Sequence, residues 1–158
     1  MDSVLFLERA ENELKLAKIV FAVSQDFPLQ TKLFDEKYPE TYYSATITHC
    51  YYCIFYCAKA YLINKGVKLV APQEHKKAYV ALMKYAKTGE LDLELLKLYQ
   101  EALVRAETLL GIFHDEKKKR GDFTYKTLPQ ANQMPARESI ANAQTFYKNL
   151  RAIVQKQQ

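Results

Sequence analysis

Residues 42–66 read YYSATITHCYYCIFYCAKAYLINKG, and this stretch decides the fold. Its small and apolar residues recur at three- and four-residue spacing, which is typical of an α-helix, and further tyrosines and phenylalanine fill most of the remaining surface. A helix that is apolar nearly all round is buried on several sides. We therefore predict a helix from about Thr41 to Lys65 that is central, or that also forms an oligomer interface, with Gly66 as its left-handed terminator.

Helical periodicity extends outward from this stretch over most of the chain. The sequence holds only four glycines and five prolines, and nearly all lie where the apolar period changes. We predict further helices, capped by Asp2 or Ser3 and by Asp92 where they begin, over residues 3–24, 72–88, 92–120 and from about 135 onward, with a short turn near 32–36. With no long period-two run, the sequence predicts an all-α, up-and-down bundle of four to five helices in a single domain, residues 1–158.

Positive charge is concentrated near the carboxy terminus. The net charge is +5, and residues 117–158 hold nine Lys and Arg against two Asp and Glu. Such asymmetry indicates a polyanionic partner, although cations at a helix end are also favoured by the helix dipole alone.

The sequence predicts a cytoplasmic protein without a membrane span. Its first residues lack a basic region and a cleavage site, and no apolar run reaches about 18 residues. The three cysteines, an odd number, indicate reduced thiols. Cys50, Cys53 and Cys57 share one helical face, but a single straight helix cannot wrap a tetrahedral metal, so we predict buried packing and no metal or cofactor.

The best local candidate for a binding site is the basic run at residues 117–120 with the aromatic residues that follow. Such a combination can pair phosphates with cations and stack bases on aromatic rings. The alternative, equally favoured by the spacing, is that Phe123 and Tyr125 close the end of the bundle while the lysines face water. His75, at a helix start, fits a structural role better than a ligand contact. Patterns for P-loops, serine hydrolases and zinc proteases do not occur.

Three segments together resemble the HEPN superfamily, named for nucleotide binding in higher eukaryotes and prokaryotes. They are YYSATITHCYYCIFYCAKAYLINKGV, similar to the family's YYxxFxxAxAxL helix, then HKKAYVALMKYAKTGELDLELLKLY, and last KKKRGDFTY with the final helix. The resemblance implies a helical bundle that forms a homodimer around a positively charged cleft. It also implies RNA or a nucleotide as ligand, and a toxin–antitoxin or defence role with an antitoxin or nucleotidyltransferase as partner.

Ribonuclease members of that family share an arginine and, after four to six residues, a histidine. Here Arg120 matches the arginine, but Tyr125 stands at the histidine position, and tyrosine with its pKa of about 10 transfers protons poorly at neutral pH. We therefore predict binding without turnover, in which Arg120 holds phosphate and Tyr125 positions it. His114 could supply the missing imidazole only if the helix end bends or a dimer partner provides it. The predicted binding residues are Lys117, Lys118, Lys119, Arg120, Asp122, Phe123 and Tyr125.

Two alternatives to a degenerate site remain. One is an active, metal-independent ribonuclease that depends on Arg120. The other is a non-catalytic partner of a nucleotidyltransferase, which docks through the tyrosine-rich helix.

Overall fold

Long α-helices form the part of the chain that the computed structural model describes. This part comprises residues 2–35, 37–91, 106–125 and 133–156, without the side chains of 106–110 and 121–125. Its helices are α1 (Ser3–Val23), α2 (Phe27–Phe34), α3 (Tyr43–Asn64), α4 (Glu74–Lys87), α6 (Ala106–Tyr125) and α7 (Gln133–Lys156). The predicted all-α fold is confirmed.

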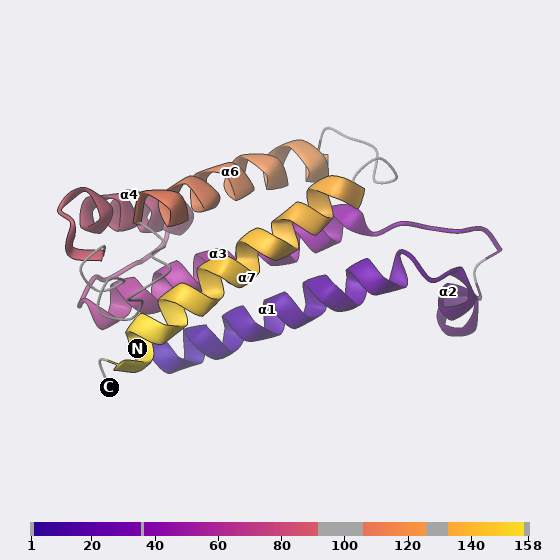
Figure 1. The fold of residues 1–158 in the computed structure, drawn as a ribbon, viewed down its shortest axis with the longest axis horizontal. Helices are drawn as coiled ribbons and strands as arrows, with labels where there is room; N and C mark the ends of the chain where they lie inside the picture. The colour runs from indigo at the N-terminus through magenta and orange to yellow at the C-terminus, as the bar shows by residue number, and fades with distance from the viewer. Residues whose placement is uncertain (1, 36, 92–105, 126–132, 157–158) are drawn as a thin grey trace, which may run out of the picture.

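The four longest helices, α1, α3, α6 and α7, lie side by side along the long axis of the molecule, and successive ones run in opposite directions (Figure 1). Helix α3 contacts α1, α4, α6 and α7, so the prediction of a central helix is confirmed. Helix α4 packs on α3 and α6, whereas α2 projects beyond one end of the bundle (Figure 1).

Burial on several sides explains the composition of α3. Its largest fully buried side chains are those of Tyr51, Tyr61, Ile47, Ile54 and Leu62. The helix ends as predicted: Gly66 has φ +77°, its N–H donates to the Ile63 carbonyl at 2.9 Å, and the Val67 N–H donates to the Leu62 carbonyl at 2.9 Å. This pair of hydrogen bonds is the Schellman motif, which satisfies carbonyls that the end of a helix leaves open.

Aspartate caps set the beginnings of the first two helices. The Asp2 carboxylate accepts a hydrogen bond from the Val4 N–H at 2.9 Å, and the Asp26 carboxylate accepts one from the Leu29 N–H at 2.9 Å. The second cap corrects a prediction, because helix α2 begins at Phe27 and not near residue 32. Pro28, which was predicted to end the first helix, lies in the first turn of α2, where proline is tolerated.

Three predicted boundaries were wrong. Helix α4 begins at Glu74, after Gln73 with φ +63°, and not at Pro72. Helix α7 begins at Gln133, two positions before the proline expected to start it. Helix α6 continues through Gly121 to residue 125, where a loop was predicted. An interior glycine costs a helix only about 1 kcal/mol, which packing against α3 and α7 can offset. The predicted cap at residue 92 lies outside the described residues.

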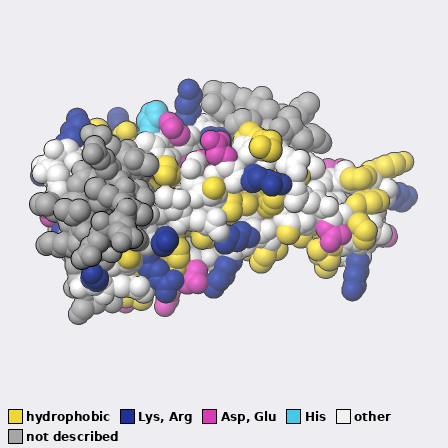
Figure 2. Space-filling view, in the orientation of Figure 1, with side chains coloured by type: hydrophobic (Ala, Val, Ile, Leu, Met, Phe, Trp, Pro, Cys, Tyr) yellow, Lys and Arg dark blue, Asp and Glu magenta, His cyan; other side chains and the backbone are white. Residues whose placement is uncertain are grey.

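Exposed hydrophobic side chains cluster on α2, at the end of the molecule where this helix projects beyond the bundle. Figure 2 shows apolar side chains gathered over α2, where Leu33, Phe34 and the following Tyr38 are each more than half exposed. None of the described helices is long and apolar enough to cross a membrane.

Candidate phosphate-binding site

Arg120 lies on the face of α6 that packs against α3. Its guanidinium carbon is 4.6 Å from the centre of the Tyr51 ring and 5.8 Å from that of Tyr52. Both distances fall within the range of attraction between a cation and an aromatic face. The side chain is half-buried, and its Nε is buried with no hydrogen-bond partner. Among the described residues, no carboxylate forms an ion pair with Arg120. The guanidinium therefore keeps donors for a ligand.

His75 reaches the same two tyrosines from the first turn of α4. Its ring stacks on Phe55 with centroids 3.9 Å apart, and its Nδ1 is hydrogen-bonded to the Tyr51 hydroxyl at 2.8 Å. Tyr52 meets the ring edge to face at 5.8 Å. The fold thus gathers His75, Arg120 and the two tyrosines into one group, which we call the His75–Arg120 cluster.

Burial and positive charge set the protonation of this cluster. Burial lowers the pKa of His75 below its ordinary 6.5, the Arg120 charge lowers it further, and Glu74 opposes both. Burial raises the pKa of Tyr51 to about 12, against the opposing effect of Arg120. At neutral pH the cluster therefore presents a neutral imidazole, a protonated phenol and a guanidinium cation.

An ion pair between a buried lysine and a partly exposed glutamate fixes the start of α4 beside the cluster. Lys59 of α3 donates to the carboxylate of Glu74, the residue that precedes His75. The Lys59 ammonium also lies 4.3 Å from the centre of the Phe6 ring on α1. Because Lys59 is buried and held on both sides, it keeps the first turn of α4, and with it the histidine, against α3.

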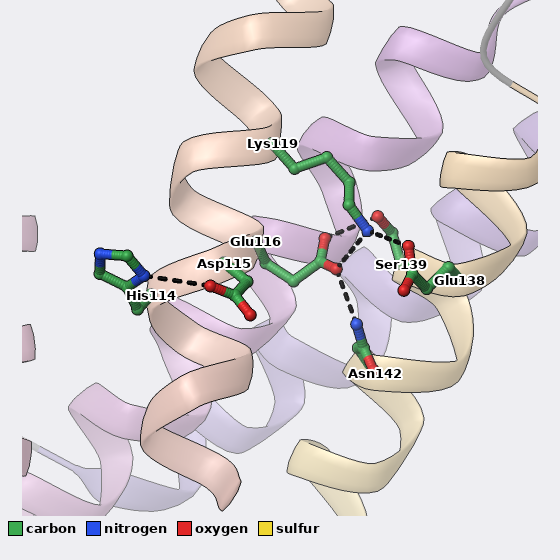
Figure 3. A network of polar contacts seen from close by, with 7 residues as sticks. All are labelled: His114, Asp115, Glu116, Lys119, Glu138, Ser139 and Asn142. Atoms are coloured by element: carbon green, nitrogen blue, oxygen red, sulfur yellow. Dashed lines mark hydrogen bonds and ion pairs between the residues drawn. The ribbon is translucent and has the colours of Figure 1, made fainter.

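Lys119 belongs to a different network, between α6 and α7 (Figure 3). Its ammonium donates to Glu116 at 3.0 Å and to Glu138 at 2.7 Å. The fully buried Glu116 also accepts hydrogen bonds from Ser139 at 2.6 Å and Asn142 at 2.9 Å. Burial acts to lower the pKa of Lys119, but its bonds to the two carboxylates outweigh this and raise the pKa. Lys119 thus ties two helices together.

The other predicted site residues are spread around α6. Lys117 is half-buried and close enough to His75 to lower its pKa, after the larger effects of burial and Arg120, and Lys118 is exposed. His114 points away from the Glu116 network (Figure 3), with its Nδ1 3.1 Å from Asp115 and its ring 6.0 Å from that of Tyr79. Asp122, Phe123 and Tyr125 have helical backbones, and their side chains lie outside the described residues.

The cysteines take the packing role that was predicted for them. Cys50, Cys53 and Cys57 are free and buried in the core. Burial raises the pKa of the Cys50 thiol far above its ordinary value, with Glu116 adding to the effect. The Cys50 thiol is therefore held in its unreactive, protonated form.

Sequence reasoning missed the nearest neighbours of Arg120. His75 was assigned a structural role, and Tyr51 and Tyr52 were assigned to the core or to a protein interface, because nothing local in the sequence joins the first turn of α4 to the last turns of α6. One signal was present, since the segment that resembles the HEPN family's third helix begins at this histidine.

Comparison with known proteins agrees with the helical bundle and defines its class. The HEPN domain family matches residues 32–153, so the chain belongs to the HEPN family. A stretch of 66 residues is 35% identical to the "Putative toxin MJ0142" of Methanocaldococcus jannaschii. That stretch is 41% of this chain and 43% of the archaeal protein, so the similarity spans less than half of either. No solved structure matches the chain.

Proposed function

We propose that this HEPN protein binds RNA or a nucleotide, with Arg120 as the main phosphate-binding residue. The observation that carries the proposal is the contrast between neighbouring cations. Lys119 is held by two carboxylates, whereas Arg120 lies on aromatic rings and forms no ion pair with a described carboxylate. A guanidinium with free donors suits phosphate, and the partly exposed Tyr52 offers a face on which a base can stack.

Lys117 and Lys118 supply positive charge around Arg120, and the proposal extends to Asp122, Phe123 and Tyr125 as residues that contact the ligand. We expect the protein to act as a homodimer in a toxin–antitoxin or defence setting, with an antitoxin or a nucleotidyltransferase as partner. The toxin name of the archaeal relative supports this setting.

The structure bears on the alternative of docking through the tyrosine-rich helix. Of the tyrosines on α3, Tyr43, Tyr51 and Tyr61 are buried within the bundle, and Tyr52 and Tyr56 are partly exposed. Little of this helix is therefore open to a protein partner, which favours the nucleic-acid proposal.

Fluorescence anisotropy with a labelled RNA oligonucleotide tests the proposal. Arg120→Ala should weaken binding by on the order of 10- to 100-fold, because a hydrogen bond to a charged group contributes about 1.5–3 kcal/mol. Lys118→Ala should weaken it less and reduce the salt dependence by about one phosphate contact.

Arg137→Ala is the matched control. Arg137 is an exposed arginine of α7 whose guanidinium carbon lies 5.7 Å from the centre of the Phe21 ring, so the variant loses the same charge and the same kind of contact elsewhere. Equal, small losses in all three variants would show that binding is diffuse and that Arg120 marks no site.

A further inference from the structure

His75 lies in this site although it is not the histidine of the arginine–histidine pattern that the ribonuclease members share. We propose that His75 is the proton-transfer residue of the Arg120 site, so that the protein cleaves RNA without a metal although Tyr125 replaces the expected histidine. This inference rests on the proposed binding of RNA by Arg120, and it narrows the ligand to RNA that has a 2′-hydroxyl at the bound phosphate.

The chain has three histidines, and their surroundings separate them. His49 is paired with Glu13, with Nδ1 2.6 Å from the carboxylate oxygen, between α3 and α1. His114 is 60% exposed and pairs with Asp115. His75 shares Tyr51 and Tyr52 with Arg120. Position therefore singles out His75 as the imidazole that can act on a phosphodiester held by Arg120.

The contacts of His75 fix the direction in which its ring points. Stacking on Phe55 sets the plane of the ring, and the Tyr51 hydroxyl engages Nδ1, which leaves Nε2 for a substrate. If Nδ1–H donates to the Tyr51 oxygen, Nε2 presents its lone pair. A hydrogen bond that fixes the tautomer in this way is how an oriented imidazole becomes a general base.

The charges around His75 favour the same role. The cations near His75 are Lys59 of α3 and Lys117 and Arg120 of α6. The neighbouring carboxylate on α4, Glu74, forms an ion pair with Lys59. Burial comes first among the causes that lower the pKa of His75, and the cations add to it, so the ring is neutral and can accept a proton. A phosphate bound at Arg120 would offset the cations and make the ring more basic.

The proposed step needs no co-reactant. Nε2 of His75 takes the proton of the 2′-hydroxyl, O2′ forms a bond to phosphorus, and the bond from phosphorus to O5′ breaks. The leaving O5′ takes a proton from water, which gives a 2′,3′-cyclic phosphate and a 5′-hydroxyl end. Arg120 stabilises the negative charge on the phosphoryl oxygens in the transition state.

The test measures binding and cleavage of one labelled RNA in EDTA, with wild type, His75→Gln, His114→Gln and Arg120→Ala. His49→Gln serves as the matched control, because it removes another partly exposed, hydrogen-bonded histidine. We expect wild type to form a 2′,3′-cyclic phosphate. His75→Gln should keep binding within about threefold and lose at least about 100-fold in cleavage, the usual contribution of general acid–base catalysis. The same RNA with a 2′-deoxy residue at the cut should be bound and left intact.

Two outcomes overturn the inference while the proposed function stands: wild type that binds RNA but does not cut it, and His75→Gln that cuts as well as wild type. Loss of cleavage in His114→Gln alone would assign the role to the other histidine. Wild type that neither binds nor cuts would refute the proposed function as well.

A readout on unaltered protein covers the case in which His75→Gln fails to fold. The cleavage rate of wild type should rise with pH along an acid limb whose midpoint lies below 6.5 and equals that of the His75 ring measured by NMR. Midpoints that differ would show that His75 does not carry the proton.

Discussion

Replacing Glu116 with alanine removes the buried carboxylate that joins α6 to α7. Glu116 is fully buried and accepts hydrogen bonds from three side chains, two on α7 and one on its own helix; these are Ser139, Asn142 and Lys119 (Figure 3). After the substitution, the hydroxyl and the amide on α7 lose their acceptor, and the ammonium keeps only its bond to Glu138.

The expected cost follows from these contacts. Removing one partner from a buried ionic network costs about 3–5 kcal/mol, and each buried donor left without a partner accounts for roughly 1–3 kcal/mol of this. In a chain of this length, 1 kcal/mol lowers Tm by about 2–4 °C, so a cost of about 3–5 kcal/mol should lower Tm by roughly 6–20 °C.

Glu138→Ala is a demanding control, because Glu138 contacts the same ammonium at the shorter distance of 2.7 Å, against 3.0 Å for Glu116. Its side chain is 66% exposed, and an exposed ion pair contributes only about 0–1 kcal/mol. Urea unfolding followed by circular dichroism should show the large loss for Glu116→Ala alone. Equal losses, or a larger one for Glu138→Ala, would show that burial does not decide the strength of these contacts.

Three further predictions concern the cluster, the core and a turn. Arg120→Gln should raise the pKa of His75 in an NMR titration, and an unchanged titration would refute the coupling between the two residues. Because folding lowers the pKa of His75, the free energy of unfolding should decrease as pH falls below about 6.5. The buried thiols, Cys50 among them, should react with a thiol reagent only as fast as the protein unfolds, and rapid labelling of native protein would contradict this. Gly66→Ala should destabilise the protein by about 1 kcal/mol because φ at this position is +77°. Gly111→Ala lies in α6 with open space around the added carbon and should stabilise the protein by about 0.5–1 kcal/mol. Thermal melts of the two variants test both expectations.

The sequence predicts correctly those parts of the fold in which a strong local sequence signal is not opposed by tertiary packing. The core helix was predicted because its aromatic and small residues fit only a helix buried on several sides, and Gly66 ends it as expected. Local signals failed where packing outweighed them. Gly121 predicted the end of a helix, yet α6 continues through it, since the buried contacts of Glu116 and Arg120 hold that helix against its neighbours.

The candidate site was predictable only in part, and for a related reason. Arg120 could be found because the residues that mark it are adjacent in the sequence. Its neighbours His75 and Tyr51 come from two other helices, and their relation to it depends on how α4 packs across α3. Periodicity assigns each residue to a face of its own helix but does not say which face of another helix lies opposite.

The basic run shows why composition alone overstates a binding surface. In the sequence, residues 117–120 are four equivalent positive charges, but adjacent residues of a helix point about 100° apart. Lys119 consequently faces α7 and is neutralised there by Glu116 and Glu138, whereas Arg120 faces α3 and meets aromatic rings. An aromatic face attracts a cation without cancelling its charge, so the guanidinium can still attract a phosphate. The aromatic residues of α3 therefore have two roles. Most of them fill the core, and at its edge Tyr51 and Tyr52 contact both Arg120 and His75, while no carboxylate among the described residues forms an ion pair with Arg120.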